Sequence, residues 1–230
     1  DAIVELRDVR AIREEGRYAA PAPKQMPPPD FPLATMVLNV TNQCNLACTY
    51  CYEYGEDKIV DTAHGAQPKF MSEETARESV EFLLREAGRS AHLTFFGGET
   101  LLNFPVVRKT IEYARRRAAA ENQVGVTVSI DGPKEMQDQF RVFHNGKGSY
   151  EAVLPRVKEL LARHRSRPIG ARVTLTSRTL DIRRIFHHLR NEVGFWEVGF
   201  APVTTAAHRG YAIENECFDH MLAQFRELAA

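Results

Sequence analysis

Long apolar runs are absent from this chain of 230 residues, and none approaches the roughly 20 residues that a membrane-spanning helix needs. The start also lacks the charged and apolar pattern of a secretory signal peptide. We therefore expect a cytoplasmic protein without a membrane partner. Because the chain opens with Asp1 instead of Met, we expect a fragment or trimmed termini.

An excess of either charge is also absent, because Lys plus Arg and Asp plus Glu both number 30. The resulting formal charge of zero gives no argument for nucleic acid as a partner, and we expect none. Hydrophobic residues make up 43% and charged residues 26%, which is typical of a globular protein and excludes a disordered or fibrous one.

Cysteine is scarce, and three of the four cysteines lie within a short segment from Cys44 to Cys51. This distribution excludes the disulfide framework of a small secreted domain. Clustered thiols suit a reducing compartment and a metal site instead. We interpret the remaining Cys217 as an ordinary core or surface thiol.

Proline is concentrated in residues 21–32, which hold six of the 12 prolines. Because proline fixes φ and restricts the residue before it, this stretch should be extended. We interpret residues 1–32 as an N-terminal arm with a proline-rich linker, and residues 33–230 as the core domain.

Strands and helices alternate through the core domain. Apolar runs bounded by polar residues predict strands at 34–40, 92–96, 124–130, 169–176 and 196–201. Apolar residues at helical spacing predict helices at 72–88, 104–120, 150–165, 182–192 and 218–228. This alternation predicts an α/β fold, in which a parallel sheet is covered by helices on its outside.

The chemistry of the chain is concentrated in Cys44, Cys48 and Cys51, whose spacing is C-x3-C-x2-C. They follow directly after the first predicted strand, where α/β barrels place their active sites. Iron–sulfur clusters normally have four thiolate ligands. Three close thiolates can therefore hold three irons of a cubane and leave the fourth iron open to bind a substrate.

A Cys3His zinc site and a chance cluster of buried cysteines are the alternatives. Zinc motifs usually combine two C-x2-C-type pairs, and this sequence has no second pair. Cys217 and His220 form only a single C-x2-H pair. The spacing, the preceding strand and the aromatic Tyr50 before the last cysteine favour an iron–sulfur cluster.

The cysteine spacing, with Tyr50, resembles the signature of the radical S-adenosylmethionine (SAM) superfamily. The resemblance implies a partial (β/α)6 TIM-like barrel. It also implies that Cys44, Cys48 and Cys51 bind a 4Fe–4S cluster, whose open iron binds the amino and carboxylate groups of SAM. Tyr50 would then lie near the adenine.

Two further motifs follow later predicted strands. Gly97-Gly98-Glu99 resembles the GGE motif of the superfamily, in which glycines let the backbone approach a ligand and the carboxylate pairs with an ammonium group. Residues 129–133, SIDGP, resemble a segment of peptide-modifying members, in which Ser129 would hydrogen-bond the ribose or carboxylate of SAM. The plainer interpretations are a tight turn with a solvated Glu and a Ser before an Asp-Gly-Pro turn.

Residues 41–43, 50–54, 95–103 and 129–133 narrow the resemblance to peptide maturases with a C-terminal SPASM-type domain, and within these to the maturases of quinohemoprotein amine dehydrogenase. This implies that a 5′-deoxyadenosyl radical takes hydrogen from an Asp or Glu methylene, and that a Cys sulfur attaches there as an intrapeptide thioether. The implied partners are a ribosomally made peptide or small protein subunit and an electron donor such as a flavodoxin or ferredoxin.

The chain departs from that family in two features. It ends at Ala230 without the later cysteines that bind auxiliary iron–sulfur clusters, so such clusters would belong to a missing C-terminal region. We also expect a β/α unit to be missing near residues 121–124, either deleted or disordered and absent from this sequence.

Two other functions stay open at this point. A sulfatase-maturating enzyme, which oxidises a Cys or Ser to formylglycine, shares every motif above. A non-catalytic metal-binding module is the alternative of a different class. No residue is assigned as an acid or base catalyst.

Overall fold

The computed structural model describes residues 33–51, 69–87, 90–118, 123–164 and 169–229. By its internal contacts the chain divides into Asp1–Pro32 and Leu33–Ala230, and the description below concerns the second unit. The expected N-terminal arm and linker lie outside the described residues, as do residues 119–122 at the joint where a β/α unit is expected to be missing.

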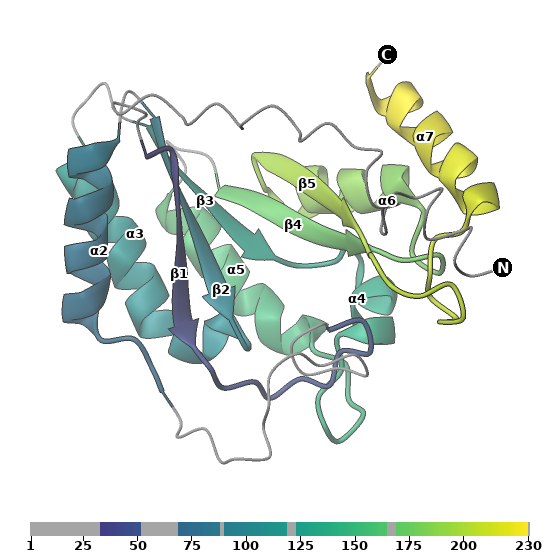
Figure 1. The fold of residues 1–230 in the computed structure, drawn as a ribbon, viewed down its shortest axis with the longest axis horizontal. Helices are drawn as coiled ribbons and strands as arrows, with labels where there is room; N and C mark the ends of the chain where they lie inside the picture. The colour runs from purple at the N-terminus through teal and green to yellow at the C-terminus, as the bar shows by residue number, and fades with distance from the viewer. Residues whose placement is uncertain (1–32, 52–68, 88–89, 119–122, 165–168, 230) are drawn as a thin grey trace, which may run out of the picture. The chain divides into compact units, whose positions relative to one another are not determined.

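The described residues form one sheet of five parallel strands in the order β1-β2-β3-β4-β5 (Figure 1). The strands are β1 (Thr35–Thr41), β2 (Ser90–Gly97), β3 (Gln123–Ser129), β4 (Ile169–Leu175) and β5 (Glu197–Pro202). β2 pairs directly with β3, from Ser90 opposite Gln123 to Thr94 opposite Thr127, so the sheet is continuous at this joint. The parallel sheet with helices confirms the α/β fold.

Helices connect the strands, and α3 and α5 lie behind the sheet in Figure 1. The helices are α2 (Glu73–Glu86), η1 (Thr100–Asn103), α3 (Phe104–Arg117), α4 (Lys134–Phe140), α5 (Tyr150–Arg163), α6 (Ile182–His187), its π-helical continuation η2 (His188–Val193) and α7 (Asn215–Ala229). All five helices expected from the sequence are present, whereas α4 and η1 were not predicted. Both are too short to show a helical repeat of apolar residues.

Local chemistry explains where α2 begins. The Ser72 hydroxyl accepts a hydrogen bond from the Thr75 backbone N–H at 3.0 Å, and Glu73 and Glu74 occupy the first turn. A side-chain cap satisfies an N–H group that has no partner within the helix, and acidic side chains complement the positive end of the helix dipole.

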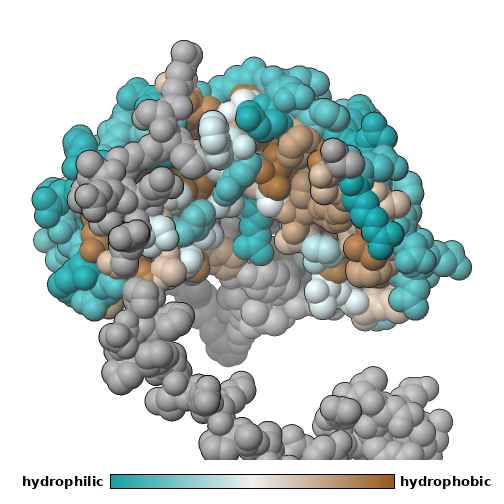
Figure 2. All heavy atoms as spheres, turned by 90° about the horizontal axis from the view of Figure 1, so that it is seen from above, coloured by the Kyte–Doolittle hydropathy of each residue, from teal (hydrophilic) through white to brown (hydrophobic). Residues whose placement is uncertain are grey.

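The hydrophobic core lies between the sheet and the outer helices. In β2 the buried side chains alternate, at Ala91, Leu93 and Phe95, and they belong to one core with Ile111 of α3. Successive side chains of a strand point to opposite faces, so this face of the sheet is covered. In the view of Figure 2, hydrophilic residues form the outer rim and apolar residues gather toward the middle.

The opposite face of the sheet, which we call the inner face, is mostly polar and only partly buried, although Val37 and Phe96 also lie on it. Its side chains come from the alternate positions of the strands, among them Asn39, His92, Thr94, Thr127, Ser129, Arg172 and Thr174. Among the described residues, no helix has the length and apolar composition needed to cross a membrane.

Truncation of Leu93 tests this core, because its side chain is fully buried in β2. We expect Leu93→Ala to lower the free energy of unfolding by about 2–5 kcal/mol, since it removes packed methyl groups and leaves a cavity. Leu102→Ala is the matched control, because Leu102 is 38% exposed, and it should cost less than about 1 kcal/mol. Urea denaturation measures both, and equal losses would contradict the assignment of the core.

A buried histidine makes stability depend on pH. His164 follows α5 and is 8% exposed, and burial, with the nearby Arg115, lowers the pKa of its imidazole to about 4. An unfolded chain takes up this proton at about pH 6.5, so the free energy of unfolding should fall as the pH drops from about 6.5 to 4, by roughly 1–2 kcal/mol once solvent screening is included. In a His164→Gln variant, urea denaturation across this range should give a smaller fall; an identical fall would contradict the prediction.

Candidate functional site

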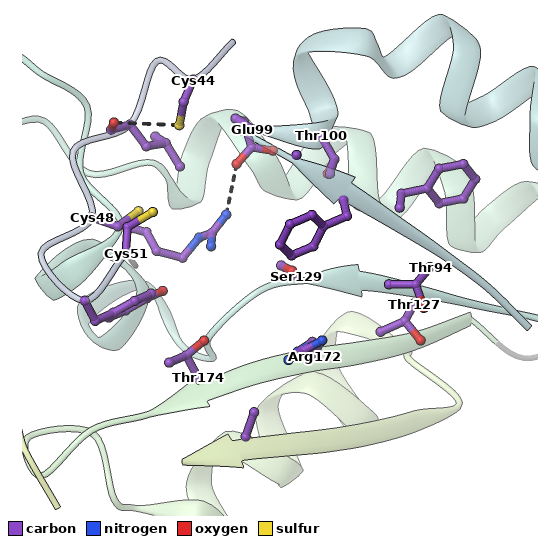
Figure 3. A pocket seen from close by; sticks show the side chains of 18 of the residues that line it. Cys44, Cys48, Cys51, Thr94, Glu99, Thr100, Thr127, Ser129, Arg172 and Thr174 are labelled. Carbon is purple, nitrogen blue, oxygen red and sulfur yellow. Dashed lines mark hydrogen bonds and ion pairs between the residues drawn. The ribbon is translucent and has the colours of Figure 1, made fainter. Parts of the chain in front are cut away.

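A cavity of about 450 Å³ lies at the C-terminal ends of the strands (Figure 3). It is lined by residues from the ends of β2 to β5 and from the loop after β1. Every residue that the sequence singled out for a metal or cofactor lines this cavity: Cys44, Cys48, Tyr50, Cys51, Gly97, Gly98, Glu99 and Ser129. The fold therefore brings together motifs that are far apart in the sequence.

The segment that carries the thiols, residues 42–51, is called the cysteine loop below. It is held by parts of the chain that follow β3 and β5. The Ala47 N–H donates to the carbonyl of Val142 at 2.7 Å, and Leu46 forms a β-bridge with Phe143. The Tyr211 hydroxyl donates to the carbonyl of Thr49 at 3.2 Å. These contacts fix the loop backbone between its cysteines.

Two glycines pack the end of β2 against the start of the cysteine loop. A Cβ atom on Gly97, whose φ is +121°, would lie 2.1 Å from the carbonyl oxygen of Thr41, and one on Gly98 would lie 2.1 Å from that of Gln43. The Gly98 N–H donates to the backbone carbonyl of Thr41, and the Glu99 N–H donates to the backbone carbonyl of Gln43, both at 3.0 Å. In this structure the glycines thus permit a close approach of backbone to backbone.

Tyr50 is held by a buried carboxylate. Its hydroxyl donates to Oδ2 of Asp131, whose Oδ1 accepts the backbone N–H of Thr174 at 3.0 Å. Its ring packs 5.7 Å from that of Phe140, centroid to centroid. Burial raises the pKa of Asp131 and raises the pKa of Tyr50 well above its ordinary value. Tyr50 therefore turns its hydroxyl toward Asp131 while it lines the cavity.

Glu99 forms an ion pair with an arginine that the sequence did not indicate as a site residue. Its Oε2 lies 2.9 Å from Nη2 of Arg141, and its Oε1 accepts the Leu101 N–H at 3.0 Å. The side chains of Arg141 and Glu99 are only 13% and 8% exposed. Arg141 follows α4, the unpredicted helix, so no expected element placed it near the cavity. The Nε atom of Arg141 is buried without a hydrogen-bond partner in the described part of the chain.

The thiols have the chemistry of metal ligands. Burial raises the pKa of Cys44, and burial raises that of Cys48 to about 12, while the charge of Arg141 opposes this rise. Negative charge on neighbouring thiols raises the pKa values of Cys44 and Cys48 further, so nearby positive charge favours the thiolate forms of these two residues. A bound metal provides that charge and deprotonates a coordinating thiol outright.

The kind of metal site follows from the geometry of the ligands. Within the described ranges, no three His, Cys, Asp or Glu side chains converge on the position of a single ion. An iron–sulfur cluster makes a different demand, because each thiolate binds its own iron and the ligands surround the cluster. Three thiols that line one cavity fit such a cluster.

Ser129 is the last residue of β3, where it pairs with Arg172 of β4, and it lines the cavity together with Arg172 and Thr174. Figure 3 places Ser129 and Thr174 near the strand ends. Arg172 lies two residues before Thr174 on the same strand, so the two side chains belong to the same face of the sheet. Sequence reasoning did not find Arg172, because a charged residue within an apolar strand carries no motif.

Comparisons with known proteins agree with this geometry. Residues 38–146, which include the cysteine loop, the Gly-Gly-Glu motif and Ser129, match the family model of the Radical SAM superfamily. A serine-type anaerobic sulfatase-maturating enzyme of Bacteroides thetaiotaomicron is 28% identical over 198 residues, which cover 75% of this chain and 46% of that protein. An uncharacterized protein of Methanocaldococcus jannaschii is 30% identical over 137 residues, covering 50% and 44% of the two chains.

A solved structure, native anSMEcpe with bound AdoMet and Kp18Cys peptide, has a similar fold. The TM-score is 0.59 at 19% identity, and the match covers 86% of this chain and 60% of that one. The chain spans less than half of the length of the two curated relatives named above.

Adding a methyl group to Gly98 tests the packing of the cysteine loop. We expect Gly98→Ala to displace Gln43 and with it Cys44, whose Cβ would lie 3.0 Å from the new atom. Iron and sulfide bound after anaerobic purification should fall to less than about half. Gly210→Ala is the control, because its new Cβ would meet only the end of the Arg178 side chain, at 2.9 Å. Equal iron contents in the two variants would contradict this role.

Proposed function

We propose that this protein is a radical SAM peptide maturase that forms thioether crosslinks, and the match of residues 38–146 to the family model of that superfamily supports the proposal. Its substrate is a ribosomally made subunit of quinohemoprotein amine dehydrogenase, in which a Cys sulfur becomes bonded to an Asp or Glu methylene carbon. The observation that carries the proposal is that three thiols share one cavity with Glu99 and Ser129 at the strand ends.

The similarity to that superfamily implies a 4Fe–4S cluster and SAM as the cofactors. Cys44, Cys48 and Cys51 would hold the cluster, which supplies one electron for reductive cleavage of SAM to methionine and a 5′-deoxyadenosyl radical. Tyr50 and Ser129 line the same cavity and would contact SAM. A flavodoxin or ferredoxin would deliver the electron.

The chain itself contributes position and shielding. The cysteine loop is fixed by hydrogen bonds to Val142 and from Tyr211, so the thiolates keep their places. The buried pair of Glu99 and Arg141 closes one wall of the cavity. Radical chemistry needs reactive atoms held close together and other hydrogen donors kept away, and the rigid wall serves both needs.

In the proposed reaction, a 5′-deoxyadenosyl radical would take one hydrogen atom from the Asp or Glu methylene and become 5′-deoxyadenosine. A carbon–sulfur bond would form as the substrate thiol loses its proton, and one electron would pass to an acceptor such as an auxiliary iron–sulfur cluster. Each crosslink therefore removes two hydrogens from the substrate.

A second candidate function is the maturation of sulfatases, in which a Cys or Ser is oxidised to formylglycine. It is favoured by the 28% identity to the Bacteroides enzyme over 198 residues. The motifs in the cavity are common to both functions, so the substrate decides between them.

Mass spectrometry of the small dehydrogenase subunit, co-expressed with the full-length protein, tests the proposed function. We expect a mass lower by two hydrogens for each crosslink, and fragments that join a Cys to an Asp or Glu. An unchanged subunit together with formylglycine in a co-expressed sulfatase would replace this proposal by the second candidate.

Cysteine variants provide the matched pair for this experiment. Cys48→Ala removes a thiol of the cavity and should abolish the mass change, because the cluster loses a ligand. Cys217→Ala removes a thiol of α7, which does not line the described cavity, and should leave the mass change in place. Crosslinks formed by the Cys48→Ala variant would contradict the cluster assignment.

A further inference from the structure

The inner face of the sheet continues beyond the thiol-lined cavity. A second cavity, of about 570 Å³, is lined by residues of β2 to β5 and by none of the cysteines. It shares Thr94, Thr127, Arg172 and Ala201 with the first cavity, so the two spaces adjoin. The second cavity therefore offers room for a substrate next to the place where the thiols lie.

Arg172 stands where the two cavities meet. Its side chain is exposed, and it forms no ion pair and no side-chain hydrogen bond with any residue that the structure describes. Arg141, by contrast, is buried and paired with Glu99. Figure 3 shows Arg172 between Thr174 and Thr127, which offer hydroxyl groups and no charge.

The neighbours of Arg172 in the sheet leave space around its guanidinium. Its partners in the adjacent strands are Ser129 in β3 and Gly199 in β5. A Cβ on Gly199 would meet only the backbone oxygen of Ala171, at 3.6 Å, among the described residues, so a side chain of the described part of the chain does not fill the space next to this glycine. A planar group can thus approach the guanidinium, whose paired N–H donors match the two oxygens of a carboxylate.

The position of Arg172 indicates which carboxylate it meets. It precedes Thr174 by two residues, which places it roughly 6–7 Å behind Thr174, away from the C-terminal end of the strand. It also lines the second cavity, which contains no thiol. Glu197 lines the same cavity from β5, and its carboxylate lies over Gly170, two residues before Arg172, so an incoming acidic group is expected on the side of Arg172 away from Glu197.

We propose that Arg172 binds the carboxylate of an acidic side chain in the peptide substrate, and that the second cavity receives this part of the peptide. This inference rests on the proposed function and names its substrate class: a peptide whose Asp or Glu is held beside the thiol-lined cavity. The guanidinium would fix the carboxylate, and the adjoining methylene would face the first cavity. A neutral Cys or Ser gains nothing from this contact.

Binding of two labelled peptides to the full-length holoprotein tests the proposal without turnover. One peptide alternates Gly with Asp, the other Gly with Asn, and fluorescence anisotropy at low salt gives both dissociation constants. We expect the Asp peptide to bind the unsubstituted protein about tenfold more tightly, as one charge-assisted bidentate contact provides. Arg172→Gln should remove this preference, whereas Arg172→Lys should retain part of it.

Arg183→Gln is the matched control, because Arg183 lies on α6, is paired with Glu227, and is not a lining residue of either cavity. This variant should keep the tenfold preference. Equal binding of the two peptides by the unsubstituted protein, or an undiminished preference in Arg172→Gln, would overturn the proposal.

A third measurement separates the peptide from SAM as the source of the carboxylate. The dissociation constant of SAM for the holoprotein should change less than about twofold in Arg172→Gln. A tenfold weaker binding of SAM with an intact peptide preference would assign Arg172 to the methionine carboxylate. An absent crosslink in the dehydrogenase subunit, with the Asp preference lost in Arg172→Gln, would reject only the proposed function.

Discussion

The close packing of the end of β2 against the start of the cysteine loop is the constraint on which the site depends. At Gly97 and Gly98 the two backbones approach so closely that no Cβ atom fits between them. Hydrogen bonds to the carbonyls of Thr41 and Gln43 then fix the chain just before Cys44. The position of Cys44 is therefore fixed, at the edge of the sheet where β3 and β4 also end.

Buried polar pairs complete the walls of the cavity. Glu99 pairs with Arg141, and Asp131 accepts a hydrogen bond from Tyr50. Charged groups are stable in a protein interior only when their partners are in place, so each pair holds two segments in one arrangement. The segment after β3 thus supports both the loop after β1 and the turn after β2, while Arg172 keeps its charge available at the inner face.

Much of the fold could be predicted from the sequence, because a strand or helix shows its own repeat of apolar residues. The segment 92–96 lies within β2, and Leu93 is buried as its alternation requires. The helix α4 escaped prediction because it has only seven residues. Arg141 directly follows α4, so its place beside the cavity was not predicted either. Glu99 was expected to meet an ammonium group of a ligand, and in the structure it pairs with the guanidinium of Arg141.

The sequence by itself determined the thiol spacing, the order of strands and helices, and the placing of each motif directly after a strand, since all three are local along the chain. Parallel strands then bring those motifs to one edge. Only the tertiary structure decided that Tyr50 meets Asp131, 81 residues away, and that Arg141 meets Glu99, 42 residues away. Such contacts depend on strand register and helix placement, which no local pattern of residues encodes.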